Sequence, residues 1–424
     1  MFQVGKPPRS RSTCAASPLY EEDKNVLKAD YVCGFYGARD SYEIPVALQE
    51  AGLLNILLTD YYGKIPWLKK LGLVRAERYH PELDPRKVCG SVWLTFAKKI
   101  SERLFADPEL QNHLPDLWLS AQIGKTSARE KAHIFTYEPY VVPRPEGGFS
   151  HCRKHILFHC HPHVECENRI FTEDQKKYPE FYHQSKVNES PYRRRTADAW
   201  RQADMILCAS SFTRDSLVAA GMPGGRCRVI PYGTRPRFDD IEVKRDGPLK
   251  LLFVGRNPLR KGLHHLLLGW REAKKKTGDR LTVVSMAPER PLQELATGQD
   301  DVVWKDSVNG EELGRLYQEA DALVVPSLCE GFGHVYLEAM GYGCAVVGTG
   351  NSALPDLGGE EEGVYQLAVG QPAKLAELIG RASAEPEIFR SRSKRAQKRS
   401  QEFTWEKFRA AIKDAVGFRV CGKA

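Results

Sequence analysis

Short apolar segments alternate with amphipathic helical segments along most of the chain. The apolar segments are bounded by turn-forming residues, which is typical of parallel strands buried on both faces. They lie at residues 31–35, 54–58, 133–136, 155–159, 205–209 and 228–231, and then at 251–254, 281–285, 322–326 and 345–348. Helical periodicity is clearest where Leu263, Leu266, Leu267 and Trp270 share one face. This order predicts open α/β sheets covered by helices.

The predicted strands are too many for one sheet of ordinary size, so we expect two domains. A polar, turn-rich segment at residues 235–247 separates two strand signals and is the predicted linker. The expected division is a flexible N-terminal arm, a first Rossmann-like domain, a second Rossmann-like domain and a C-terminal helix that packs back toward the first domain. Their predicted bounds are residues 1–29, 30–238, 239–402 and 403–424.

Composition excludes several classes of protein. Of 424 residues, 42% are hydrophobic and 27% are charged, which excludes wholesale disorder. The formal net charge is +8, but residues 381–424 hold 12 basic and 5 acidic side chains, so the excess is local. Because a nucleic-acid binder commonly has a basic face throughout, we expect no nucleic-acid partner.

The expected localisation is cytoplasmic. No apolar run approaches the roughly 18 residues that a membrane helix requires. Residues 1–30 lack the apolar core of a signal peptide, and the 11 cysteines include no C-x-x-C pair, which indicates reduced thiols. A peripheral contact at the inner membrane face is an open alternative, because a basic tail suits an anionic surface.

Residues 326–350 contain the most informative motif. A predicted strand ends at Pro326, a loop carries Glu330, and a helix beginning near His334 carries Glu338. Both carboxylates therefore lie beyond the carboxyl end of a strand, where open α/β sheets bind ligands.

The chemistry of this motif suits a nucleotide sugar. Glycines and a helix N-terminus favour a diphosphate, and the predicted phosphate-binding residues are Gly331, Phe332, Gly333, His334 and Val335. Glu338 could accept hydrogen bonds from a ribose diol, whereas Glu330 could stabilise positive charge at an anomeric carbon. The alternative is that Glu330 is a solvated loop residue and Glu338 an ordinary charge on a helix face.

A second anion-binding loop follows the strand at 251–254. Arg256 and Lys261 bracket a proline-containing turn that opens a helix. A guanidinium offers a fork to phosphate and an ammonium offers a point charge. Ordinary surface basicity is the alternative interpretation.

Both motifs resemble those of the retaining glycosyltransferases of family 4, which have the GT-B fold. The signature EGFG-x3-LEAM-x2-G, with its two glutamates separated by seven residues, matches Glu330–Gly343, and the phosphate loop G-R-x4-K-G matches Gly255–Gly262. Residues 203–210, 229–233 and 320–327 also match typical patterns of the family. The resemblance covers the chain from near Ala203 to the C-terminus.

The resemblance implies a retaining glycosyltransferase that takes a nucleoside diphosphate sugar as donor and requires neither a metal nor another cofactor. The usual G-G-x-P-E pattern is replaced here by residues 351–356, which leaves the contact of that loop with the donor sugar undetermined. Because the first third of the chain matches only in pattern, the acceptor is not assigned among glycans, lipid-linked sugars and small molecules. Oligomeric state is likewise not assigned.

In the first domain, two loops are candidates for the facing wall of the cleft. Gly34 and Gly37 lie on the loop after the strand at 31–35, which in the family lies beside donor phosphates and acceptor. Family members often carry a catalytic histidine at the end of a later strand, and either His159 or His161 resembles it. Surface or capping histidines are the alternative.

Three other groupings allow different interpretations. Eight potential metal ligands lie within 16 residues, but their spacing does not match a closed zinc site; they are His151, Cys152, His155, His159, Cys160, His161, His163 and Cys166. Residues 67–71 and 92–100 mix aromatics with lysines, which suits a membrane interface or, more simply, a core-facing helix with a solvated lysine face. Residues 191–195 form a small basic cluster, which suits a solvated helix face or a contact with a phosphate of the acceptor.

Two further functions are compatible with the same motifs. The pocket could serve a GT-B sugar phosphorylase or a nucleotide-sugar epimerase, whose products would be a free sugar phosphate or an epimerised donor. A non-catalytic GT-B binding subunit would bind a donor without turnover. The presence of Glu330, Glu338, Arg256 and Lys261 favours the transferase.

Overall fold

The computed structural model describes residues 30–63, 78–104, 108–137, 154–182, 199–234, 246–286 and 290–417. Several segments singled out in the sequence lie outside these residues. They are the arm at 1–29, the segment at 67–71, His151, Cys152, the basic cluster at 191–195 and most of the predicted linker at 235–247.

The first sheet has seven parallel strands in the order β3-β2-β1-β4-β5-β6-β7. The strands are β1 (Tyr31–Gly34), β2 (Leu54–Thr59), β3 (Val88–Gly90), β4 (His133–Tyr137), β5 (His155–His159), β6 (Met205–Cys208) and β7 (Cys227–Val229). The central strands β1 and β5 are buried along their whole length, as their continuous apolar runs predict.

Helices connect the strands of this first domain. They are α1 (Glu43–Glu50), α3 (Val92–Leu104), α4 (Pro108–Glu130), α5 (Val164–Lys177) and α7 (Ser211–Ala219), with short 3₁₀ helices at Arg39–Tyr42, Pro85–Lys87, Pro179–Phe181, Ala199–Gln202 and Gly224–Arg226. Ser210 begins α7, because its side chain accepts a hydrogen bond from the Thr213 N–H at 3.1 Å.

The second sheet has six parallel strands in the order β10-β9-β8-β11-β12-β13. They are β8 (Lys250–Val254), β9 (Arg280–Val284), β10 (Val302–Lys305), β11 (Ala322–Val325), β12 (Ala345–Thr349) and β13 (Val364–Leu367). Three strands of the molecule, β3, β10 and β13, are not predicted by the apolar pattern, and each lies at the edge of its sheet.

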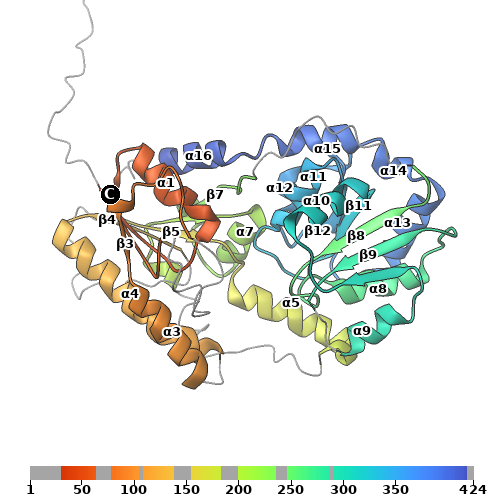
Figure 1. Cartoon of the computed structure of the whole chain (residues 1–424), viewed down its shortest axis with the longest axis horizontal. Coiled ribbons are helices and arrows are strands. Elements are labelled where there is room, and N and C mark those ends of the chain that lie inside the picture. The colour runs from red at the N-terminus through yellow and green to blue at the C-terminus, as the bar shows by residue number, and fades with distance from the viewer. Residues whose placement is uncertain are drawn as a thin grey trace, which may run out of the picture.

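The helices of the second domain are α8 (Leu263–Glu272), α9 (Arg290–Thr297), α10 (Gly310–Glu319), α11 (His334–Gly341), α12 (Leu354–Leu357), α13 (Pro372–Ala384), α14 (Glu387–Arg390) and α15 (Ser393–Ser400), with a 3₁₀ turn at Glu360–Glu362. The apolar face predicted for α8 is buried, and Trp270 is fully covered. Figure 1 shows the two sheets side by side, each with its own helices.

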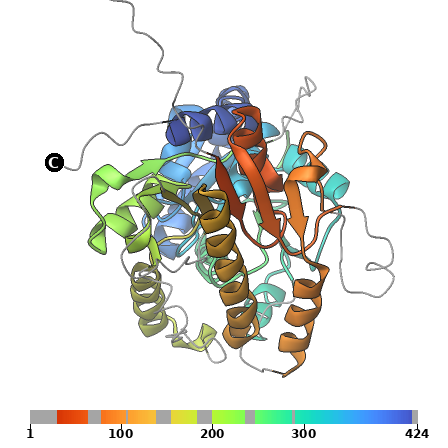
Figure 2. The ribbon, with the colours of Figure 1, turned by 90° about the vertical axis from the view of Figure 1, so that its left-hand side faces the viewer.

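The last helix, α16 (Trp405–Gly417), lies against α1 of the first domain, and the views in Figure 1 and Figure 2 both show the two helices together. Arg409 binds the Glu43 carboxylate at 2.8 Å, and Lys413 binds Glu50 at 2.7 Å. Its apolar face is buried as well, with Phe408 and Ile412 both almost fully covered. The chain therefore crosses back to the first domain after completing the second.

Aromatic side chains continue the core across the domain boundary. The Tyr232 ring lies 5.3 Å from that of Phe158 in the first domain and 5.2 Å from that of Phe332 in the second. All three rings are buried. The domains are thus joined by apolar packing close to the predicted phosphate loop.

Helix α3, which contains residues 92–100, exposes large apolar side chains in addition to the lysines expected on its solvated face. Trp93 is 81% exposed and Leu104 is 71% exposed, so large apolar side chains face outward there. Among the described residues, no helix is both long enough and apolar enough to cross a bilayer.

Candidate active site

Loops from the two domains meet at the predicted phosphate loop. A Cβ added at Gly331, on the loop after β11, would lie 1.7 Å from the carbonyl oxygen of Cys160, on the loop after β5. The Gly331 carbonyl also accepts hydrogen bonds from Ser210 Oγ at 2.6 Å and from Thr213 Oγ1 at 3.2 Å. Because only glycine permits so close an approach, this residue fixes the loop against the first domain.

A cavity of about 360 Å³ opens beside this meeting point. Its wall combines the first domain, the second domain and the start of α16, and includes Ser41, Thr234, Tyr317, His334, Glu338 and Trp405. This volume is within the range of pockets that bind small organic ligands. Glu338, which the sequence assigns to ribose, therefore lies on a cavity wall.

Glu330 is a nearly buried carboxylate paired with a lysine. Its Oε2 lies 2.5 Å from Lys261 Nζ, and both side chains are less than a fifth exposed. Burial alone would raise the pKa of Glu330, but the charges of Lys261 and Arg260 outweigh burial and hold that pKa below its usual range. The carboxylate is thus kept ionised beside the phosphate loop.

The backbone holds Glu330 in place. Its N–H donates to the Asn351 carbonyl at 2.8 Å, and the Asn351 side chain donates to the Leu328 carbonyl at 2.9 Å. Asn351 belongs to the segment that departs from the family pattern. Here that segment holds the loop that carries Glu330 through these two hydrogen bonds.

Glu338 is oriented by a tyrosine. The Tyr317 hydroxyl, on α10, donates to Glu338 Oε2 at 3.0 Å. Tyr317 is buried, and its pKa is raised well above the usual range by that burial and by the Glu338 charge. It therefore remains a hydrogen-bond donor at any ordinary pH and leaves the other carboxylate oxygen available to a ligand.

The N-terminus of α11 begins at a left-handed glycine and a stacked histidine. Gly333, with φ of +92°, precedes the helix, and the His334 ring stacks on Tyr232 with centroids 4.7 Å apart. Burial lowers the pKa of His334 to about 4, although the Glu330 carboxylate opposes this shift. His334 is therefore neutral at pH 7 and can donate a hydrogen bond without adding charge.

The side chains of the other predicted phosphate-binding residues are occupied by packing, so only their backbone could meet a phosphate. Phe332 is 3% exposed, and its ring belongs to the aromatic contact with Tyr232. Val335 is partly buried on α11. A diphosphate at this helix end would meet the N–H groups of the first turn and the positive end of the helix dipole.

The two predicted basic residues of the loop after β8 differ in their contacts. Lys261 points to Glu330, whereas Arg256 is exposed and makes no hydrogen bond or ion pair among the described residues. Gly262, with φ of +69°, lets the start of α8 approach β11, because a Cβ there would lie 2.0 Å from the Pro326 carbonyl oxygen. That contact positions Lys261 beside the end of β11.

Arg260 is a residue of this loop that the sequence did not single out. Its guanidinium binds Glu167 of α5 at 2.6 Å and donates from Nε to the Cys329 carbonyl at 2.9 Å. It thus joins the two domains and also supports the Glu330 loop. The only signal in the sequence is its place between Arg256 and Lys261.

The two candidate histidines differ in their surroundings. His159 is buried, and its Nδ1 lies 2.6 Å from the His161 carbonyl oxygen, so it braces the loop. The His161 side chain is exposed, and its charge helps to lower the pKa of Glu330. The backbone of His161 lies next to the Glu330 loop, because a Cβ at Gly331 would stand 3.1 Å from His161 Cα.

The two glycines of the predicted glycine loop have different structural roles. A Cβ at Gly34 would lie 2.2 Å from the Ile123 side chain, so Gly34 lets α4 pack on β1. Gly37 has φ of +80°, and its N–H donates to Asp60 at 3.1 Å. Neither observation places these glycines at a ligand.

Three residues just beyond this loop were missed by the sequence interpretation. Asp40, Ser41 and Tyr42 all have left-handed backbone, with φ of 45°, 53° and 68°. Such strain in non-glycine residues concentrates at functional sites. Ser41 lines the cavity, and the Tyr137 hydroxyl donates to Asp40 at 2.5 Å.

Asp40 is partly buried beside Tyr137 and Tyr232. Burial raises the pKa of Asp40 to about 6, even though hydrogen bonds from these two hydroxyls and the Arg39 charge work in the opposite direction. Its carboxyl group therefore titrates close to neutral pH, next to the cavity. The sequence offered one signal for this site: Asp40 and Ser41 are polar residues between the glycine loop and the helix that follows it.

The histidine and cysteine cluster does not form a metal site in the part of the chain that is described. His155 bonds Thr136 at 2.8 Å, His159 bonds the His161 backbone, and His163 caps α5. Strand β5 and its loop thus direct these side chains to separate partners.

Comparison with known proteins links the second domain to one family. Residues 248–385 match the family model described as glycosyl transferases group 1. An uncharacterized glycosyltransferase of Methanocaldococcus jannaschii is 28% identical over 165 residues, which are 35% of this chain and 42% of that protein. The MMP alpha-(1->4)-mannosyltransferase of Mycolicibacterium hassiacum is 27% identical over 212 residues, which are 48% of this chain and 51% of that protein. The chain therefore spans about half the length of these relatives or less.

Solved structures resemble nearly the whole chain. Sucrose-phosphate synthase from Thermosynechococcus elongatus has a TM-score of 0.60 and 18% identity, with 92% of this chain and 98% of that chain covered. Anabaena Alr3699/HepE in complex with UDP-glucose has a TM-score of 0.56 and 16% identity, with coverage of 91% and 99%. The predicted GT-B fold, with its two Rossmann-like domains, is confirmed.

Proposed function

We propose that this chain is a retaining glycosyltransferase that moves a sugar from a nucleoside diphosphate sugar to an acceptor bound between the domains. The observation that carries this proposal is the Glu330–Lys261 pair at the start of α11, with Glu338 further along the same helix on the cavity wall. These residues lie in the segment that matches the glycosyl transferases group 1 model.

The donor would lie along α11. Its diphosphate would meet the N-terminus of the helix, Lys261 and the exposed Arg256, because fixed donors and cations stabilise a leaving phosphate. The ribose diol would bind the oxygen of Glu338 that Tyr317 leaves available. A structure of the same fold, Anabaena Alr3699/HepE, is in complex with UDP-glucose, which supports this class of donor.

The chemistry would proceed on one face of the sugar. The bond from the anomeric carbon to the leaving diphosphate oxygen breaks, the acceptor oxygen bonds to that carbon, and the acceptor proton passes to the departing phosphate oxygen. Glu330 would stabilise the positive charge at the anomeric carbon, and Lys261 the negative charge of the diphosphate. The reaction so described requires no metal. Retention and membership of family 4 rest on the likeness of the glutamate motif.

The first domain would bind the acceptor. Ser41 and Thr234 of this domain line the cavity, and His161 lies next to the Glu330 loop, so these residues offer polar contacts for acceptor hydroxyls. A lipid-linked acceptor would bring α3 to a membrane, where exposed Trp93 and Leu104 beside Lys99 suit an anionic interface. Sedimentation with anionic and with neutral vesicles distinguishes such an acceptor from a soluble glycan or small molecule.

The test is a screen of UDP-, GDP- and ADP-sugars for release of the nucleoside diphosphate, with binding followed by calorimetry. We expect one donor to bind and to be hydrolysed slowly without an acceptor. An exposed control, Arg315→Ala, should behave as wild type. Release of a sugar 1-phosphate would indicate a phosphorylase, an epimerised donor would indicate an epimerase, and binding with no turnover would indicate a binding subunit.

A further inference from the structure

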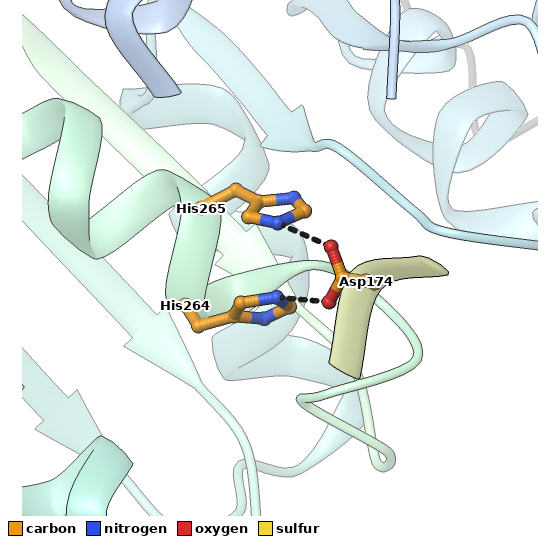
Figure 3. A group of neighbouring side chains, drawn as sticks. All are labelled: Asp174, His264 and His265. Atoms are coloured by element: carbon orange, nitrogen blue, oxygen red, sulfur yellow. Dashed lines mark hydrogen bonds and ion pairs between the residues drawn. The ribbon is translucent and has the colours of Figure 1, made fainter. Parts of the chain in front are cut away.

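Three buried side chains from two domains converge away from the proposed active site. Asp174 belongs to α5 of the first domain, whereas His264 and His265 form the first turn of α8 in the second domain. Their side chains are 4%, 0% and 1% exposed. Figure 3 shows both imidazole rings pointing to the Asp174 carboxylate.

Both histidines contact the Asp174 carboxylate at short distance. His264 Nε2 lies 2.8 Å from Asp174 Oδ2 in hydrogen-bonding geometry. His265 Nε2 pairs with Oδ1 of the same carboxylate, also at 2.8 Å. Two buried imidazole nitrogens thus face the two oxygens of one carboxylate, which are atoms that a transition metal can bind together.

One potential ligand atom from each of the three residues lies within 4.8 Å of the others, and in the described residues no other group of three histidine, cysteine or acidic side chains does so. We propose that Asp174, His264 and His265 bind a divalent transition metal, zinc in the first place, at the interface of the two domains. This proposal is independent of the proposed sugar transfer.

The donor set decides the class of metal. Two imidazole nitrogens and one carboxylate suit zinc and related transition metals, whereas calcium and magnesium require more oxygen ligands. The second carboxylate oxygen or a small ligand can complete the coordination. Gly370 lies beside the cluster, and a Cβ there would stand 4.0 Å from both Asp174 Oδ1 and the His265 ring. Because glycine has no side chain, residue 370 leaves that side of the cluster open.

A neighbouring tyrosine orients the carboxylate. The Tyr182 hydroxyl donates to Asp174 Oδ2 at 2.6 Å, and Tyr182 is itself 4% exposed. Hydrogen bonds of this kind from outside the ligand set hold metal-binding carboxylates in place. The site is therefore supported on the α5 side by a residue of the same domain.

The position of the site indicates its role. Asp174 lies two turns after Glu167 on α5. His264 lies four residues after Arg260, at the start of α8. The metal site and the Arg260–Glu167 pair therefore both connect α5 to the segment that begins α8. Lys261 and Gly262 lie between these contacts. A bound metal would therefore clasp α5 to the start of α8 and fix the loop that carries Lys261, without contacting the reacting groups.

The experiment uses the full chain with any histidine tag removed. The protein is stripped with chelator, loaded with zinc, dialysed and assayed for metal by mass spectrometry and for thermal unfolding. We expect about one zinc ion per chain and a higher unfolding temperature with zinc. Asp174→Asn and His265→Gln should lower zinc affinity by at least about a hundredfold, because losing a ligand costs more than losing an outer hydrogen bond. His133→Gln, which changes a histidine outside the cluster, should leave zinc binding unchanged.

Two outcomes would overturn the proposal. Wild-type protein that retains no zinc after dialysis would show that the cluster is held by hydrogen bonds and ion pairs alone. Zinc retained equally by Asp174→Asn and His265→Gln would place the metal elsewhere in the chain. Should these variants not fold, wild-type protein loaded with cobalt decides the question: visible bands of tetrahedral cobalt support the site, and their absence rejects it.

Discussion

Lys261 Nζ lies 2.5 Å from Glu330 Oε2, so the cation proposed for the leaving diphosphate and the carboxylate proposed for the anomeric carbon neutralise each other. Both come from loops at the carboxyl ends of neighbouring strands, β8 and β11. A donor that enters between them would bring a negative group to Lys261 and, in the transition state, a positive centre to Glu330. Each charge would then meet its opposite in the substrate.

Glu330→Gln should lower turnover by about 10²–10³ while nucleoside diphosphate affinity is little altered or rises. The change keeps the shape of the side chain but removes the charge that faces the anomeric carbon, a loss of about 2.7–4 kcal/mol. It also leaves Lys261 without its anionic partner. Steady-state kinetics and calorimetry measure the two effects, and near-normal turnover would contradict the assigned role.

Lys261→Ala should weaken binding of the nucleoside diphosphate about tenfold or more. A charged hydrogen bond is worth roughly 1.5–3 kcal/mol, and the variant also leaves the Glu330 carboxylate facing the phosphates. Arg256→Ala should act in the same direction. Calorimetry with the nucleoside diphosphate found in the donor screen tests both, with Arg315→Ala as control, and unchanged affinity in both variants would remove the proposed phosphate site.

Glu338→Gln should mainly raise the KM for the donor. Its proposed contact with the ribose is made equally in the ground state and in the transition state, so kcat should change little. Tyr317→Phe removes only the hydrogen bond that orients this carboxylate, and its effect on KM should be smaller. A large loss of kcat in Glu338→Gln with Glu330→Gln unaffected would reverse the roles of the two glutamates.

Asp40 should make stability depend on pH. Its pKa is raised from 3.8 to about 6 in the folded chain. Protonated Asp40 therefore contributes stability that is fully present below pH 3.8 and is lost as pH rises through 6. Between about pH 4.5 and 7.5, wild type should lose on the order of 1–2 kcal/mol relative to Asp40→Asn.

Urea unfolding at several pH values measures this difference. Asp215→Asn, at an exposed carboxylate of α7, serves as the matched control and should follow wild type at every pH. A constant difference between wild type and Asp40→Asn would show that Asp40 does not titrate in this range.

The chemical step should not require a metal. The clean test uses His265→Gln, which should hold the ion proposed for the domain interface at least about a hundredfold more weakly, so that an effect of chelator reports mainly on the reaction itself. With donor and acceptor, turnover of this variant should persist in chelator at temperatures where it is folded. Activity that disappears in chelator and returns with magnesium or manganese would overturn the metal-independent mechanism.

The apolar pattern predicts every central strand, whereas of the four edge strands in the described sheets it predicts β7 and misses β3, β10 and β13. Strands such as β5 and β12 are buried on both sides, so their side chains must be apolar and the signal is continuous. The unpredicted strands β3, β10 and β13 have a neighbour on one side only. Val302–Lys305 of β10 is partly exposed throughout, and its mixed composition hides it.

The candidate site shows the same division. Glu330, His334 and Glu338 lie within nine residues of one another, so a local motif contains them all. Arg260 and Glu167 are separated by 93 residues, and Asp40 and Tyr137 by 97. No local spacing relates such pairs.

The sequence by itself determined the two α/β domains, because strand burial and helix periodicity act over a few residues. It also contained the local motif of the proposed donor site, and the resemblance of that motif to a known family implied the GT-B fold. Tertiary structure alone decided which distant groups face each other: Lys261 with Glu330 within the second domain, and Asp174 with His264 and His265 across the domains. The physical reason is that the contacts across the domains depend on how two separately formed sheets pack together, and that packing is set by many weak contacts spread over the whole interface.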